Sequence, residues 1–181
     1  MSQVEERIAN IRDLLSSGKS FDFERMLQSH YERFLVAGDS VIDVGAHTGR
    51  HLAKFIQCVG RSGTVFAFEP LSFAFDLLKE RYGKLVNVKI ENVALSDVAG
   101  IVDFVHARGT PEESGLRQRI YNSPETANPV VVSVECAMLD DYIDQFTKVD
   151  YIKIDVEGGE INVLRGAESV LRAFRPIVSV E

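Results

Sequence analysis

The spacing of apolar residues changes along the chain from a helical period to a strand-like one. Near the N-terminus, apolar residues recur at spacings of three and four, first from Val4 to Leu15 and then from Phe23 to Phe34. This period predicts two amphipathic helices, each with an apolar face that needs a partner. From Val41 onward, short apolar runs of strand length alternate with segments of helical period.

The alternation continues to the end of the chain. Helices are predicted at residues 48–59, 72–82, 139–146 and 160–173, and strands at residues 41–44, 64–68, 88–93, 101–105, 130–134, 150–156 and 177–180. Strands that alternate with helices indicate an α/β fold with a doubly wound, mostly parallel sheet. We therefore expect one domain overall, in which helices within residues 1–39 pack on or cap a core formed by residues 40–181.

Composition and charge narrow the classes of function. The chain has 181 residues, is 45% apolar and carries a net charge of −7, so it can bury one sizeable core but lacks the basic surplus that nucleic acid binding needs. Cys58 and Cys136 are far apart and outside any metal-binding spacing, so we expect neither a disulfide nor a zinc site. The charged N-terminus and the absence of a long apolar run predict a cytoplasmic protein with no membrane partner.

The stretch VIDVGAHTG predicts a ligand-binding turn after the first strand of the sheet. In a doubly wound sheet this turn reaches the crevice beyond the strand ends. Its spacing, Asp43-x-Gly45-x-x-x-Gly49, differs from the GxGxxG pattern that holds a pyrophosphate. An aspartate at this place suits a ligand with a cationic amino-acid group, such as S-adenosylmethionine. The alternative is a turn without a ligand, in which Asp43 caps the next helix.

Glu69 supports the interpretation as a cofactor site. It ends the second predicted strand, twenty residues after Gly49, where an acidic side chain can accept hydrogen bonds from both ribose hydroxyls. His47, within the turn, contacts the cofactor or substrate in one interpretation and is a surface or capping residue in the other.

A second group of charges interrupts the apolar strand in YIKIDVEGGE. In extended geometry Tyr151, Lys153 and Asp155 share one face. A buried Lys153 needs a carboxylate partner, and the candidates are Asp155, Asp43 and Glu69. Charged residues at the mouth of a sheet often serve a site. The alternative is a structural ion pair, with Glu157 and Glu160 complementing the positive end of the following helix.

Several of these stretches together identify a family. The segments VIDVGAHTG, VFAFEP, NVALSD, LDDYI, KIDVEG, VLRGAE and RPIVSVE occur in an order that resembles the FkbM-like S-adenosylmethionine-dependent methyltransferases, over about residues 40–181. The resemblance implies a Rossmann-like class I methyltransferase fold and methyl transfer to a hydroxyl group, usually of a sugar or a secondary metabolite. The chain departs from the usual pattern of the family at His47, where asparagine is common, and at Gly159, where alanine is common.

The resemblance also implies roles for individual residues. Asp43, Gly45, Ala46, His47 and Gly49 would form the turn beside the methionine part of the cofactor, and Glu69 would bind the ribose. Asn92, Ala94 and Leu95 would lie near the adenine. The reaction centre would be faced by Lys153, Asp155 and Glu157.

Deprotonation of the acceptor hydroxyl needs a base or an electrostatic stabiliser. Asp155 and Glu157 are the candidate bases, and Lys153 would orient them or stabilise the developing alkoxide. We expect no metal, since the candidate oxygen ligands are few. The competing hypotheses are a cofactor-binding protein without turnover and, less favoured because GxGxxG is absent, an NAD-dependent dehydrogenase.

The class I fold normally continues past its fifth core strand into an antiparallel hairpin, whereas this sequence ends at Glu181. A last strand left at a sheet edge invites pairing with another chain. We therefore expect either a homodimer formed through this edge or a truncated chain. The long aperiodic segment 107–129 is expected to be either a lid over the acceptor or a solvated loop.

Overall fold

The structure is a computed structural model that describes residues 22–116 and 124–181. The helix predicted from Val4 to Leu15 lies outside these residues. Helix α2 spans Phe23–Tyr31, and its first turn is capped by Asp22, whose side chain accepts a hydrogen bond from the backbone N–H of Arg25 at 2.9 Å. The packing of the N-terminal helices on the core remains a prediction. In the described part of the chain, no helix has the length and apolar content needed to cross a membrane.

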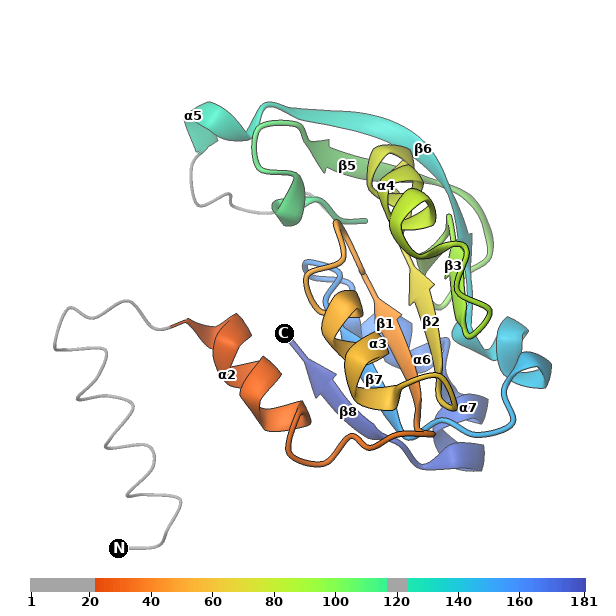
Figure 1. Cartoon of the computed structure of the whole chain (residues 1–181). Coiled ribbons are helices and arrows are strands. Elements are labelled where there is room, and N and C mark those ends of the chain that lie inside the picture. The colour runs from red at the N-terminus through yellow and green to blue at the C-terminus, as the bar shows by residue number, and fades with distance from the viewer. Residues whose placement is uncertain (1–21, 117–123) are drawn as a thin grey trace, which may run out of the picture. The chain divides into compact units, whose positions relative to one another are not determined.

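The core, within Leu35–Glu181, is built on a five-stranded parallel sheet (Figure 1). The strands follow the order β3-β2-β1-β7-β8, with bounds Val88–Glu91, Thr64–Phe68, Ser40–Val44, Tyr151–Ile154 and Ile177–Val180. All four neighbouring pairs are parallel. Successive strands run outward from β1 in one direction and from β7 in the other. The ligand crevice of such a sheet lies beyond the strand ends where the order reverses, which is at β1 and β7.

Helices cover both faces of this sheet. Helix α3 (Leu52–Val59) lies on the face toward the viewer in Figure 1, while α6 (Glu160–Arg165) and α7 (Glu168–Phe174) lie behind the sheet. On that second face, alternate residues of β1 and β7 form one apolar cluster with the helices: Ile42, Val44, Ile152, Ile154, Val163 and Val170. The opposite side chains of the same strands include Asp43 and Lys153, so the polar residues share the α3 face.

Several helices differ from their prediction: α2 ends at Tyr31, before Phe34, and the helix predicted at 139–146 is a 3-10 helix over Leu139–Gln145. The helix predicted at 48–59 begins only at Leu52, because the turn before it continues to His51. The helix predicted at 160–173 is broken into α6 and α7 at Gly166, where a Cβ atom would lie 1.9 Å from the carbonyl oxygen of Ser96. Close backbone contact therefore sets the position of the break. Helix α4 (Ser72–Tyr82) has the predicted bounds.

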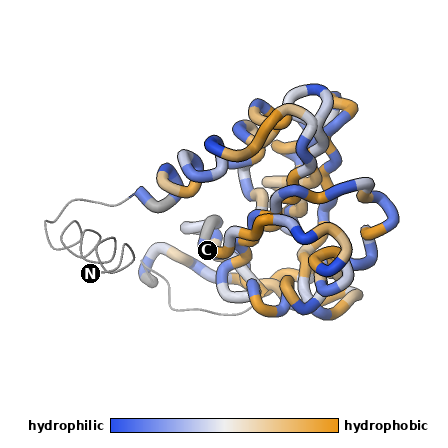
Figure 2. Tube along the Cα trace, turned by 90° about the horizontal axis from the view of Figure 1, so that it is seen from below, coloured by the Kyte–Doolittle hydropathy of each residue, from blue (hydrophilic) through white to orange (hydrophobic). Residues whose placement is uncertain are grey.

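A second, three-stranded sheet contains the strands predicted around residues 101–105 and 130–134. It has the order β4-β6-β5, with bounds Ala94–Leu95, Pro129–Ala137 and Gly100–Ala107. Strands β5 and β6 are antiparallel, so this part of the chain does not extend the parallel sheet. Its inner face packs Phe104, Val134 and Cys136 against Leu71 and Ala74 at the start of α4. The tube in Figure 2 shows the resulting alternation of apolar and polar stretches along the trace.

Short structured pieces occur in the described parts of the segment predicted to be irregular. They are a 3-10 helix, η1 (Pro111–Glu113), a bridge between Val105 and Gly115, and α5 (Pro124–Ala127). A second 3-10 helix, η2 (Leu139–Gln145), precedes β7. The role of residues 107–129 as a lid over the acceptor remains a prediction. Dimerisation through the outer edge of β8 remains a prediction as well.

Candidate functional site

The turn after β1 lies directly against the end of β7. The backbone N–H groups of Gly45 and Ala46 both donate to the carbonyl oxygen of Phe68, at 3.0 and 3.1 Å. Gly45 has φ +80°, and a Cβ atom there would lie 1.8 Å from the carbonyl oxygen of Asp155. Only glycine combines this backbone conformation with this close approach. The turn thereby brings the ends of β1, β2 and β7 together.

The other residues of the turn connect it to α4. Gly49 has φ +87°, and a Cβ atom there would lie 2.7 Å from Cδ2 of Leu78, so this glycine permits the turn to pack on α4. His47 also has a positive φ, +45°, which is uncommon for a residue with a side chain. Ala46 is 5% exposed and contributes to the buried core.

Glu69 holds the turn in place through its carboxylate. Oε2 accepts a hydrogen bond from the backbone N–H of His47 and Oε1 accepts one from that of Leu71, both at 2.8 Å. The carboxylate therefore ties the cofactor turn to the start of α4. A carboxylate has about four acceptor positions, so two such bonds leave capacity for the ribose hydroxyls.

The electrostatic environment of Glu69 favours a cationic ligand. Burial raises its pKa to about 7; the hydrogen bonds from Leu71 and His47 oppose this shift, and the charges of Asp43 and Asp155 add to it. The charges of Asp43 and Asp155 thus act on the Glu69 carboxylate beside the turn. The close approach at Gly45 and this concentration of negative charge fit S-adenosylmethionine, whose methionine part carries an ammonium and a sulfonium group.

Lys153 is the cation buried among these carboxylates. It is 2% exposed, pairs in register with Asp43 across β1 and β7, and its Nζ lies 2.9 Å from Oδ2 of Asp155. The prediction that a buried Lys153 meets a carboxylate is confirmed, and Asp155 is one such partner. Because Lys153 is buried and bonded to Asp155, its position supports an orienting role more than direct contact with an acceptor.

The loop that follows β7 carries Glu157 in a constrained backbone. Glu157 is half-buried and has φ +58°. A Cβ atom at Gly115 would lie 2.9 Å from the carbonyl oxygen of Glu157 and 3.0 Å from that of Val156. The segment after η1 therefore packs backbone to backbone against the loop with the candidate base. Sequence reasoning missed this contact because Gly115 carries no periodic or chemical signal.

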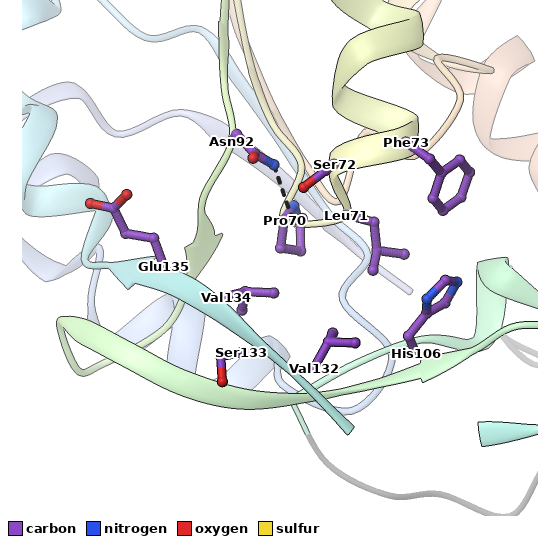
Figure 3. A pocket seen from close by; sticks show the side chains of 10 residues that line it. All are labelled: Pro70, Leu71, Ser72, Phe73, Asn92, His106, Val132, Ser133, Val134 and Glu135. Carbon is purple, nitrogen blue, oxygen red and sulfur yellow. Dashed lines mark hydrogen bonds between the residues drawn. The ribbon is translucent and has the colours of Figure 1, made fainter. Parts of the chain in front are cut away.

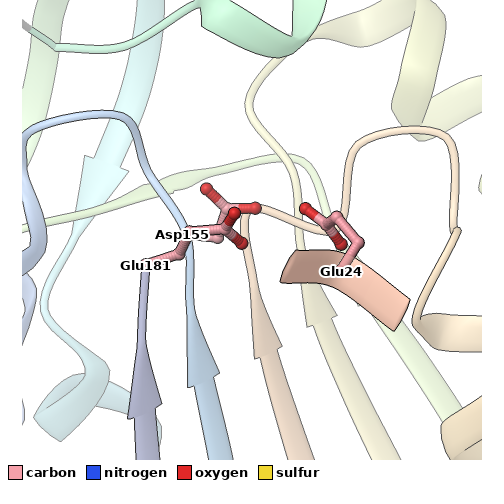
Figure 4. A group of neighbouring side chains, drawn as sticks. All are labelled: Glu24, Asp155 and Glu181. Carbon is pink, nitrogen blue, oxygen red and sulfur yellow. The ribbon is translucent and has the colours of Figure 1, made fainter. Parts of the chain in front are cut away.

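The ends of β7 and β8 bring two acidic residues together. Carboxylate oxygens of Asp155 and Glu181 lie within 4.8 Å of each other, and Figure 4 shows the two side chains next to one another. A calcium site needs about six to eight oxygen ligands. We assign no metal to this pair, and metal-free catalysis remains a prediction.

The three residues expected near the adenine occupy different environments. The side-chain amide of Asn92 donates to the carbonyl oxygens of Glu69 and Pro70, at 2.8 and 3.0 Å, and so fixes the turn after β2. Ala94 and Leu95 are 5% and 2% exposed and pack in two apolar clusters of the core. A contact between the adenine and these residues stays a prediction.

A cavity of about 370 Å³ lies between the start of α4 and the second sheet (Figure 3). One side comes from the residues just after Glu69 and from Asn92, and the other from β5 and β6. Its lining residues are Pro70, Leu71, Ser72, Phe73, Asn92, His106, Val132, Ser133, Val134 and Glu135. Sequence reasoning did not identify it, because the packing of the second sheet on α4 joins segments that are distant in the chain.

Comparison with known proteins gives the family. A model of the methyltransferase FkbM domain matches residues 43–181. The chain is 28% identical over 148 residues to the 2-O-methyltransferase NoeI of Sinorhizobium fredii, which covers 75% of this chain and 60% of that protein. It is 27% identical over 180 residues to the hexuronic acid methyltransferase AglP of Haloferax volcanii, which covers 97% of this chain and 66% of that protein. The chain thus spans about two thirds or less of the length of these relatives.

A solved structure agrees with the fold. The putative rRNA methylase of Clostridium thermocellum aligns with a TM-score of 0.50 at 13% identity, over 86% of this chain and 68% of that one. The predicted class I methyltransferase fold is confirmed by this likeness and by the parallel sheet. The family match includes the cofactor turn, Glu69 and the charged residues of β7, and it indicates S-adenosylmethionine as the cofactor. The chain belongs to the FkbM methyltransferase domain family.

Proposed function

We propose that the protein transfers a methyl group from S-adenosylmethionine to a hydroxyl group of a small acceptor, with sugars as the first class to examine. The observation that carries this proposal is the group of three carboxylates, Asp43, Glu69 and Asp155, beside the turn after β1. The conformation of this turn requires glycine at position 45. The sugar class rests on relatives named as a 2-O-methyltransferase and a hexuronic acid methyltransferase.

Each residue of the site has a part in this function. The bound cofactor supplies an electrophilic methyl group on a positively charged sulfur. Asp43 and the turn hold its methionine part, and Glu69 accepts hydrogen bonds from its ribose. Asp155, or Glu157 two residues later, takes the proton of the acceptor hydroxyl, and Lys153 fixes the orientation of Asp155 through their 2.9 Å ion pair.

Alignment supplies much of the rate in such a reaction, because attack on the methyl carbon must be in line with the bond that breaks. The packing of Gly45 on the carbonyl oxygen of Asp155 couples the cofactor turn to the strand end with the candidate base. A shift of the cofactor turn therefore also moves the end of β7, so the methyl donor and the candidate base keep the same relative position.

Calorimetric titration with S-adenosylhomocysteine tests the cofactor site, with NAD as a negative control. We expect saturable binding of S-adenosylhomocysteine alone, weakened at least tenfold by Glu69→Gln and unchanged by Glu80→Gln at an exposed position of α4. Failure of folded wild-type protein to bind would contradict the proposal.

Radiolabelled methyl transfer to a panel of monosaccharides and uronic acids tests turnover. We expect Asp155→Asn to lower turnover at least a hundredfold if Asp155 is the base, and the exposed Asp144→Asn to leave it unchanged. Near-normal turnover in Asp155→Asn would remove Asp155 from the mechanism as the base.

A further inference from the structure

The loop after β7 lies between two glycines that are distant from each other in the chain. On one side, a Cβ atom at Gly45 would lie 1.8 Å from the carbonyl oxygen of Asp155. On the other side, a Cβ atom at Gly115 would lie 2.9 Å from the carbonyl oxygen of Glu157 and 3.0 Å from that of Val156. Gly45 belongs to the cofactor turn and Gly115 to the segment after η1. Both candidate bases are therefore carried by a loop that is packed from two directions.

Gly115 differs from Gly45 in the reason why the position needs glycine. The backbone of Gly115 lies outside the left-handed region, so its conformation is one that alanine can adopt. What excludes a Cβ atom there is the packing against the loop after β7. Non-bonded carbon atoms pack best at about 3.5–4.0 Å, so a methyl group at 2.9–3.0 Å from two carbonyl oxygens must displace one of the two segments.

The segment that carries Gly115 is bonded to β5. The backbone N–H of Gly115 donates to the carbonyl oxygen of Val105 at 3.1 Å, and the N–H of Val105 donates to the carbonyl oxygen of Gly115 at 2.9 Å. The buried hydroxyl of Ser114 accepts a hydrogen bond from the backbone N–H of Ala107 at 3.0 Å. Strand β5 in turn packs on the start of α4 through Phe104. Gly115 is thus presented to the loop by the second sheet, on a fixed support.

The backbone of Glu157 needs such a support. Its φ of +58° is uncommon for a residue with a side chain, and glycine or asparagine is the usual choice in this region. Gly158 follows with φ +98°, and its N–H donates to Oε1 of Glu160 at 2.8 Å. A residue in this conformation persists only when its surroundings hold it there. The direction in which the Glu157 side chain leaves the loop therefore depends on the contacts of its backbone.

We propose that Gly115 is a positioning residue for methyl transfer, which holds the backbone of Glu157 and thereby fixes its carboxylate relative to the acceptor hydroxyl. The inference rests on the proposed function, in which Glu157 is one of the two candidate bases. Gly115 itself exchanges no proton, because it acts only through the loop. Misplacement by about 1 Å can cost about a hundredfold in rate, so one added methyl group is enough to reveal this role. The second sheet is then a part of the reaction site.

Hydrogen exchange measured by mass spectrometry tests the hold on the loop and needs no acceptor. We expect Gly115→Ala to raise the exchange rate of the backbone amides of residues 155–160 by about tenfold or more. Gly100→Ala, also in β5, adds a methyl group that meets no atom of the described residues within 4 Å. It is the matched control for lost stability and should leave these amides unchanged. Unchanged exchange in folded Gly115→Ala would overturn the inference.

A double-mutant cycle with Glu157→Gln tests the effect on methyl transfer, with the monosaccharide or uronic acid that the wild type methylates fastest. We expect Gly115→Ala to lower kcat by about tenfold or more and to leave affinity for S-adenosylhomocysteine within about threefold. In the Glu157→Gln background the same substitution should lower kcat by less than about twofold, because the carboxylate through which it acts is absent. A merely structural role gives equal factors in both backgrounds, and that result would overturn the inference.

Ser114→Ala provides the test where Gly115→Ala does not fold. It removes the hydroxyl that accepts from Ala107 and adds no atom beside the loop after β7. We expect kcat to fall by about threefold, and to stay unchanged when Glu157→Gln is also present. Normal kcat in Glu157→Gln would overturn the inference and leave the proposed function standing with Asp155 as the base. Failure of the folded wild type to bind S-adenosylhomocysteine would overturn both.

Discussion

The carboxylate of Glu69 accepts a hydrogen bond of 2.8 Å from the backbone N–H of His47, so the residue expected to bind the ribose also holds the cofactor turn. The same carboxylate holds the start of α4 through Leu71. One buried ionisable group therefore fixes the shape of the turn and carries a charge that the cofactor needs. Its protonation links cofactor binding to pH.

Cofactor affinity should increase as the pH rises through about 7. The pKa of Glu69 is raised to about 7, and the ionised form is the better acceptor for ribose hydroxyls and the better partner for a cationic ligand. Below that pH, binding releases a proton and affinity falls by up to about tenfold per pH unit. Calorimetry with S-adenosylhomocysteine from pH 5.5 to 8.5, in buffers of different ionisation enthalpy, measures both effects. A pH dependence that persists in Glu69→Gln would have another origin.

Glu69 should affect the stability of the fold in the opposite direction to cofactor affinity as the pH rises. A carboxylate whose folded-state pKa is raised from 4.5 to about 7 stabilises the fold below pH 4.5, and this contribution is lost as the pH rises through 7. The loss amounts to about 3 kcal/mol for a shift of this size. Gln does not titrate, so the free energy of unfolding of Glu69→Gln, measured relative to that of the wild type, should increase as the pH rises from 4.5 to 7.5. Urea unfolding at several pH values measures the difference, and a constant difference would contradict the assignment.

Removal of the buried cation should destabilise the protein more than removal of an exposed one. The Lys153 side chain is only 3% exposed in its ion pair with Asp155. Lys153→Met removes this pair and should lower the free energy of unfolding by about 3 kcal/mol. Lys148→Met removes an ion pair with Asp150 in which the Lys148 side chain is 47% exposed, and should cost about 1 kcal/mol or less. Chemical denaturation of both variants gives the comparison. Equal losses would mean that the environment of Lys153 is more hydrated than its burial indicates.

The sequence predicted most of the parallel sheet because its strands are apolar runs bounded by turn residues. It also indicated Asp43, Glu69 and Asp155 as site residues, because charged side chains are costly to bury at strand ends and often serve a site there. The second sheet was beyond such reasoning, since β5 and β6 pair across a segment of more than twenty residues and their apolar pattern does not specify a partner. The break at Gly166 and the cavity beside Phe73 depend on contacts with Ser96 and β6 that no local pattern contains.

Two glycines with positive φ should respond differently to alanine. Gly45→Ala adds a methyl group 1.8 Å from the carbonyl oxygen of Asp155, so the turn must move away from β7. Gly100→Ala, at φ +119°, introduces a methyl group that meets no atom of the described residues within 4 Å, and its cost is the backbone strain of about 1–3 kcal/mol. We expect both variants to lose stability and Gly45→Ala alone to lose affinity for S-adenosylhomocysteine, by tenfold or more.

Gly100→Ala is the control for backbone strain as such, because it lies in β5, away from the cofactor turn. Calorimetry on folded protein, with thermal unfolding measured in parallel, separates affinity from stability. Unchanged affinity in Gly45→Ala would show that the turn tolerates displacement from Asp155, and the proposed coupling between the cofactor turn and the base would then be wrong. Loss of affinity confined to Gly45→Ala would instead tie cofactor binding to the contact between the ends of β1 and β7, since the strain of a positive φ is common to both variants.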